Sequence, residues 1–137
     1  MAGLTLQLRE EHERLLAVLN LAKRSDLSSP ETRELLRSAR SMVLAHLRKE
    51  DIELYPVLTT AALKDARLKE TLELFAADMA DISHVAISFF KKCEQPRAGR
   101  DWAHDFGLVV SRLRSRIRRE EELLYPLYDK IMAPKAA

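Results

Sequence analysis

Histidine and glutamate side chains stand among apolar residues at helical spacing in this chain. His12 has leucines four positions before it and three and four positions after it, and His46 follows an apolar row and precedes Glu50 by one helical turn. Burying such groups is unfavourable unless they pair with one another or bind a metal. Imidazole nitrogen and carboxylate oxygen suit iron, manganese or zinc, so these residues are candidate metal ligands.

The surroundings of Glu50 occur twice in the chain. Residues 46–56 read HLRKEDIELYP and residues 116–126 read RIRREEELLYP, so the second copy keeps the glutamate and the Leu-Tyr-Pro ending. It places Arg116 where the first copy has His46. The repeat predicts that one helical hairpin is used twice.

Further ionisable residues occupy rows that we expect to face inward. His84 follows two alanines at helical spacing and precedes Ile87, while Arg116 and Glu120 lie in a row of apolar residues, with Glu121 beside them. A histidine on each of three helices and a glutamate in each copy of the repeat predict one shared site inside a helical bundle. Arg116 then decides whether a whole metal site, half of one or none remains.

The elements that position these residues are helices. Among 137 residues only three are glycine and five are proline, which favours long helices over strands. Ser29 followed by proline and glutamate is typical of a helix start, and Pro56 should kink or tighten the helix that contains it. The expected fold is an all-α, up-down-up-down four-helix bundle made of two repeated helical hairpins, in a single domain covering residues 1–137. The predicted helices span about 5–24, 30–63, 66–93 and 101–132, with a turn at 95–100.

Composition excludes several other classes of function. The net charge of +2 and the acidic residues that follow the arginine-rich stretch argue against a nucleic-acid-binding protein. No apolar run approaches the length of a membrane span, and the N-terminus lacks the features of a signal peptide. The lone Cys93 cannot form an internal disulfide, so we expect a cytoplasmic protein.

The motifs together resemble the hemerythrin-like, or HHE cation-binding, family. The similarity lies in Glu11-His12, in the His46-x-x-x-Glu50 block with its Leu-Tyr-Pro ending, in His84, and in Glu120-Glu121 with the second Leu-Tyr-Pro. It covers essentially the whole chain. The resemblance implies a non-haem di-iron centre inside the bundle, in proteins that bind dioxygen or other diatomics, store or sense iron, or sense redox state. It also implies a ligand set: His12 and His46 on one iron, Glu50 as a bridge, His84 on the second iron, and Glu120 or Glu121 as the other carboxylate.

Two departures from the family pattern alter this expectation. The family has histidine at the position of Arg116, and oxygen carriers place two histidines one turn apart where this chain has only His84. Arginine stays protonated and does not bind metals. Reversible dioxygen carriage is therefore not expected, and the cofactor could be one or two iron ions, another divalent metal, or none.

Three interpretations of Arg116 remain open. In the first, one metal binds and the guanidinium fills the space of the second ion, pairing with Glu50 and Glu120. In the second, no metal binds and Arg116 neutralises both glutamates. In the third, Arg116 extends outward and Glu121 supplies the missing ligand of a complete binuclear site.

The sequence thus predicts a metal-binding protein, with iron as the expected metal, that senses or binds rather than catalyses. The alternative is a metal-free bundle that acts as a regulatory protein-interaction module. An oxidase-like or peroxidase-like di-iron enzyme is a third hypothesis. The expected partner is a metal ion, with a diatomic ligand and a protein partner left open, and with no nucleic acid and no membrane.

Overall fold

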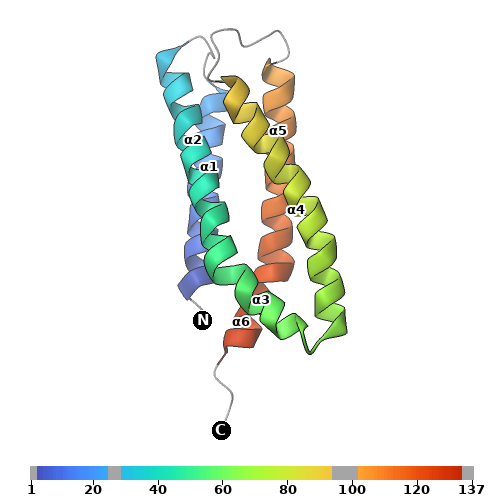
Figure 1. Cartoon of the computed structure of the whole chain (residues 1–137). Coiled ribbons are helices and arrows are strands. Elements are labelled where there is room, and N and C mark those ends of the chain that lie inside the picture. Colours follow the sequence, from blue (N-terminus) through green and yellow to red (C-terminus); the bar gives the residue numbers. More distant parts are fainter. Residues whose placement is uncertain (1–2, 25–28, 94–101, 134–137) are drawn as a thin grey trace.

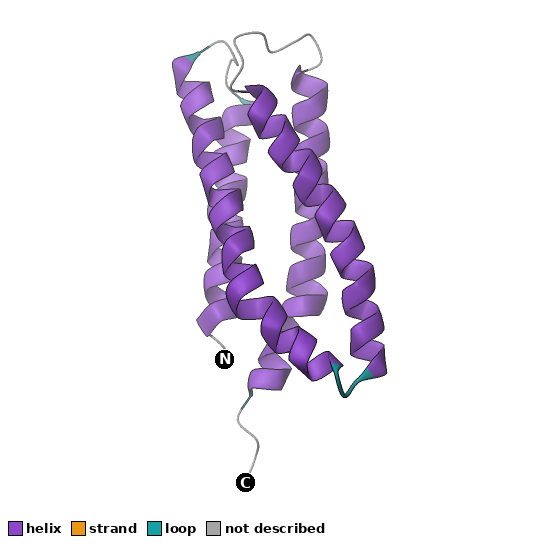
Figure 2. Cartoon of the chain, in the orientation of Figure 1, coloured by secondary structure: helices purple, strands orange, loops and turns teal. Residues whose placement is uncertain are grey.

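All regular structure in the described part of the chain is helical (Figure 2). The computed structural model describes residues 3–24, 29–93 and 102–133, so the predicted turn at 95–100 lies outside the described residues. The elements in chain order are α1 (Gly3–Lys23), α2 (Pro30–Lys49), η1 (Glu50–Leu54), α3 (Tyr55–Ala62), α4 (Ala66–Cys93), α5 (Trp102–Arg119), η2 (Glu120–Leu124) and α6 (Tyr125–Met132). The predicted all-α class is confirmed, and each predicted helix has a counterpart.

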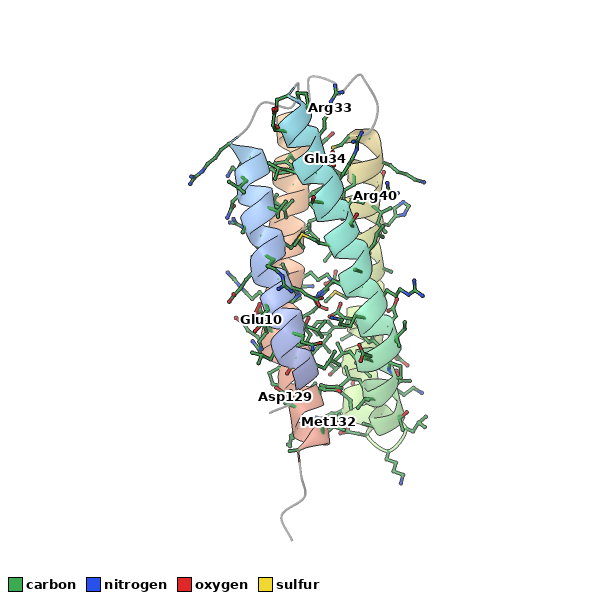
Figure 3. All side chains as sticks on the ribbon, turned by 90° about the vertical axis from the view of Figure 1, so that its left-hand side faces the viewer. Glu10, Arg33, Glu34, Arg40, Asp129 and Met132 are labelled. Atoms are coloured by element: carbon green, nitrogen blue, oxygen red, sulfur yellow. The ribbon has the colours of Figure 1, made fainter. Side chains whose placement is uncertain are left out.

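The helices lie side by side as a bundle (Figure 1). α1 packs mainly on α2, whereas α4 packs on α5 and also on α3 and α2, and α3 contacts α6 as well. The hydroxyl of Thr5 donates a hydrogen bond of 2.6 Å to Asp129, which joins α1 to α6. Figure 3 labels Asp129 at this end of the bundle. Within the described ranges, no helix has both the length and the apolar character needed to cross a bilayer.

The helix starts follow from local sequence. Ser29 has an extended backbone, and its hydroxyl accepts a hydrogen bond from the amide of Thr32 at 3.2 Å, as the sequence predicts. Pro30 occupies the first turn, where a missing N–H is harmless. The carboxylate of Asp65 likewise accepts from the amides of Arg67 and Leu68 at the start of α4.

Both copies of the repeat contain a π-helical turn just before the proline. Pro56 has no N–H, and its ring would clash with the carbonyl four residues earlier in a regular α-helix. The chain instead widens, so that the amide of Tyr55 bonds the carbonyl of Glu50, five residues back, and the amide of Tyr125 bonds that of Glu120. Of the two effects expected of Pro56, a kink or a tightening of its helix, the tightening is contradicted by this wider turn. Each wide turn begins at a fully buried glutamate, an arrangement that is frequent at functional sites.

Two apolar clusters fill the bundle on either side of a polar layer. One cluster is built around residues such as Leu19, Val43, Phe90 and Phe106, and the other around Leu8, Leu54, Phe75 and Leu124. His12 of α1, His46 of α2 and Arg116 of α5 are buried and fall between these clusters in sequence. The polar layer therefore lies in a low-dielectric interior, where unpaired charge is costly.

We predict that Leu124→Ala lowers the free energy of unfolding by about 2–5 kcal/mol, because it leaves a cavity beside the polar layer. Leu124 is fully buried, whereas its neighbour Leu123 in the same π-helical turn is 50% exposed. Leu123→Ala is therefore the matched control and should change stability by no more than about 0.5 kcal/mol. Urea unfolding of both variants measures the difference, and equal losses would contradict this packing.

Candidate metal centre

Five buried ionisable residues form the polar layer. They are His12 of α1, His46 of α2, Glu50 at the start of η1, Arg116 of α5 and Glu120 at the start of η2. The predicted inward positions of the two histidines and two glutamates are confirmed by their burial, and Arg116, whose orientation the sequence left open, is buried with them. They come from distant parts of the chain, so only the packing of the bundle brings them together.

The two imidazoles face each other across the centre of the layer. Nε2 of His12 lies 3.0 Å from Nε2 of His46 and 3.4 Å from Oε1 of Glu120. One potential ligand atom from each of these three residues lies within 4.8 Å of the others. Three donors so close together, from three separate helical segments, form a candidate cation site.

The surroundings of the Glu120 carboxyl group indicate whether a cation fits this site. Both of its carboxyl oxygens are buried, and no hydrogen-bond donor among the described residues reaches either of them. Burial, reinforced by the nearby charge of Glu50, raises the pKa of Glu120 well above its ordinary value. A cation is the partner that such a carboxylate lacks, so the residues present fit one metal ion.

The two histidines differ in how readily they take up a proton. Burial, followed by the charge of His46, lowers the pKa of His12 to about 3, so its ring is neutral at physiological pH and keeps a lone pair. Burial alone would also lower the pKa of His46. Its contacts with Glu50 and Glu11 outweigh burial, and the net shift of the His46 pKa is upward.

Arg116 occupies the side of the layer that faces α4. Its Nη2 atom lies 3.3 Å from Oε1 of Glu50, and its Nε atom lies 3.6 Å from Oε1 of Glu120. Nη1 donates to the hydroxyl of Ser83 and, at 3.4 Å, to the backbone carbonyl of Met79. The third interpretation of Arg116, in which it extends outward, is contradicted, because the residue is only 5% exposed.

Glu50 is held as a carboxylate by its neighbours. Burial raises its pKa, but contacts with Glu120 and His46 and the charge of Arg116 outweigh burial and bring the pKa of Glu50 to about 2. The phenol of Tyr125 donates to Oε2 of Glu50 at 2.9 Å. The same hydroxyl lies 3.2 Å from Nε2 of His12 and 3.4 Å from Nε2 of His46. Glu50 thus accepts hydrogen bonds from Tyr125 and Arg116, whereas Glu120 has only the longer ion-pair contact with Nε of Arg116 and no hydrogen bond within the described residues.

Two further carboxylates lie near the Nδ1 atoms of the histidines, on the side of each ring away from the centre of the layer. Oε1 of Glu11 lies 2.9 Å from Nδ1 of His46, and its other oxygen pairs with Lys49. Oε2 of Glu121 lies 3.5 Å from Nδ1 of His12, and Arg9 contacts Glu121 through both its carboxylate and its backbone carbonyl. The structure therefore puts Glu121 on the outer side of His12, away from Nε2.

His84 does not join the other predicted site residues. The expected inward orientation was wrong, because His84 is exposed on α4, as are Ala77 and Ala80, on which the expectation rested. The inward row of α4 instead contains Met79, Ile82 and Ala86, with Ser83 beside it. Small alanines do not mark a buried face, since they are tolerated on either side of a helix.

Three residues of the site are not among the predicted site residues. Tyr125 stands in the Leu-Tyr-Pro repeat that follows Glu120, and Glu11 directly precedes His12, so both positions carried a usable signal. Nothing in the sequence distinguished Ser83 from other polar residues of α4.

A small cavity borders the cluster on its apolar side. It has a volume of about 20 Å³ and is lined by leucine, valine and isoleucine side chains together with His12, His46, Arg116 and Glu120. That space suffices for about one water-sized molecule. A ligand entering the cavity without rearrangement would have to be very small.

Comparison with known proteins agrees with the geometry. The model of the family described as hemerythrin HHE cation binding domain matches residues 4–128, while no curated protein and no solved structure gives a significant match. The match spans both copies of the repeat and every buried residue of the polar layer. The chain therefore belongs to the hemerythrin HHE cation-binding domain family.

Proposed function

We propose that this protein holds a single cation, iron or a similar divalent metal, and senses or binds a small ligand instead of carrying dioxygen reversibly. The observation that carries the proposal is the buried carboxylate of Glu120, which has no hydrogen-bond donor and lies beside two imidazole nitrogens. His12, His46 and Glu120 would hold the ion, with Glu50 next to it. When bound, the cation would supply a Lewis-acidic or redox-active centre.

Arg116 is the reason for proposing one cation and not two. Its guanidinium carries a permanent positive charge and contacts both glutamates, which is the place and the charge that a second ion would need. The side of α4 that reaches Arg116 offers a hydroxyl and a backbone carbonyl, and the exposed His84 is not available there. We therefore leave His84 out of the ligand set.

The small cavity supports a sensing or binding role. About 20 Å³ beside the cluster would accommodate a diatomic molecule more readily than an organic substrate. We further infer that the bundle is two repeated up-and-down hairpins, because α1 packs on α2, α4 packs on α5, and both copies contain the same π-helical turn. The sequence contains one cysteine, Cys93, and so offers no pair for an internal disulfide, which supports a cytoplasmic location.

One observation favours the alternative, a metal-free module that regulates a partner protein. Arg116 already neutralises Glu50, and a proton on Glu120 would remove the remaining negative charge without any metal. In that case the cluster would serve only to specify the packing of the bundle. The metal content of the purified protein separates the two functions.

We expect protein produced with iron supplementation and purified without chelator to contain about one equivalent of metal, because the donor set suits one ion. His46→Ala should abolish loading. The matched control is His84→Ala, since His84 is exposed on α4. Elemental analysis of the three proteins measures this. Less than about a tenth of an equivalent in the parent would refute metal binding, and loss of metal in His84→Ala would favour a binuclear site.

Removing Arg116 should destabilise the metal-free protein strongly. Arg116→Met leaves the buried carboxylate of Glu50 without its cation, so we expect a loss of about 3–5 kcal/mol in the free energy of unfolding. Arg118→Met, at an exposed position of the same helix, is the control and should stay within about 0.5 kcal/mol of the parent. Urea unfolding in the presence of chelator tests this, and indistinguishable curves for the two variants would argue against a structural ion pair.

A further inference from the structure

Glu11 joins two helices at the outer edge of the metal centre. It belongs to α1, but its carboxylate contacts two residues of α2: Nδ1 of His46 at 2.9 Å and the ammonium group of Lys49. The side chain of Glu11 is 20% exposed, and that of His46 is 8% exposed. This contact is therefore mostly shielded from water, and the position of Glu11 is fixed from both sides.

The contact restricts where His46 carries its ring proton. An ionised carboxylate only accepts hydrogen bonds, and Glu11 lies closer to Nδ1 of His46, at 2.9 Å, than Glu50 lies to Nε2, at 3.4 Å. In the neutral ring, the shorter contact therefore favours the proton on Nδ1. The neutral ring then has Nδ1–H and keeps a lone pair on Nε2. Nε2 is the atom that points at His12, Glu50 and Glu120.

Nδ1 of His12 has no carboxylate as close as the one that contacts Nδ1 of His46. The nearest carboxylate oxygen, from Glu121, is 3.5 Å from Nδ1 of His12, and this nitrogen makes no hydrogen bond within the described residues. Glu121 is also more exposed than Glu11, with 29% of its side chain accessible. The two histidines are therefore not equivalent, and only His46 is held from the outer side.

We propose that Glu11, held by Lys49, is a positioning residue that keeps the proton of His46 on Nδ1 and so prepares Nε2 of His46 to bind the cation. The proposal rests on the metal-binding function proposed above. Carboxylates that accept from the second nitrogen of a metal-bound histidine orient the ring, and their loss typically weakens metal binding about 10–100-fold. Glu121 has a weaker effect on His12 because the distance is longer.

The first experiment reads the ring proton directly, without any metal. In chelator-treated, ¹⁵N-labelled full-length protein, at a pH where the ring is neutral, long-range ¹H–¹⁵N spectra should show His46 with Nδ1 protonated and Nε2 unprotonated. Glu11→Gln should lose this preference, because an amide can also donate to Nδ1. Glu10→Gln is the matched control, since Glu10 is exposed on α1 (Figure 3). Finding Nε2 protonated in the parent would overturn the proposal.

The second experiment measures the consequence for metal binding. Calorimetric titration with Zn²⁺ or Mn²⁺ should give an affinity about 10–100-fold weaker for Glu11→Gln than for the parent, with Glu10→Gln unchanged. Lys49→Met should weaken binding by a smaller factor, and Lys49→Arg should retain the parent affinity. An affinity of Glu11→Gln equal to that of Glu10→Gln would overturn the proposal.

The two experiments separate this proposal from the proposed function. If the parent binds no metal, the proposed function fails, and the spectra of the metal-free protein still decide whether Glu11 sets the proton of His46. If circular dichroism shows that Glu11→Gln does not fold, Lys49→Met is used in its place in both experiments. That variant leaves Glu11 in place but removes the cation that holds it. An unchanged His46 spectrum together with an unchanged affinity in Lys49→Met would then count against the proposal.

Discussion

The buried guanidinium of Arg116 lies between the carboxyl groups of Glu50 and Glu120, in a layer with apolar side chains on either side. Arginine cannot discard its charge, so the surrounding residues must balance it wherever it is buried. Glu50 provides that balance as a carboxylate, while the hydroxyl of Ser83 and the backbone carbonyl of Met79 accept hydrogen bonds from Nη1. This leaves Glu120 as the carboxyl group without a donor, and a single cation would satisfy it.

A change at one position of the repeat accounts for the asymmetry of the centre. Both copies give a π-helical turn that starts at a buried glutamate, but the first copy contributes an imidazole and the second a guanidinium four residues earlier. The imidazole side brings together His12, His46 and Tyr125, whose polar atoms lie within hydrogen-bond distance of one another. The guanidinium side carries a permanent positive charge, which would repel a cation. The proposal of one cation instead of two rests on this asymmetry.

The inward positions of most site residues could be predicted from helical spacing, whereas contacts between residues distant in sequence could not. The inward positions of His12, His46, Glu50 and Glu120 follow from helical spacing against large apolar neighbours, and the pairing of Arg116 with both glutamates follows from the cost of burying charge. His84 was misplaced because its row consisted of small alanines, which pack on either face of a helix. The contacts of Glu11 with His46 and of Tyr125 with Glu50 join residues 35 and 75 positions apart, and helical spacing carries no information about such pairs.

The most direct measurement is anomalous diffraction from crystals of the protein loaded with iron or manganese. The account predicts one anomalous peak within bonding distance of His12, His46 and Glu120, with the guanidinium of Arg116 still against Glu50. A second peak in the space that the guanidinium now fills, or a loaded crystal with no peak in the polar layer, would contradict it.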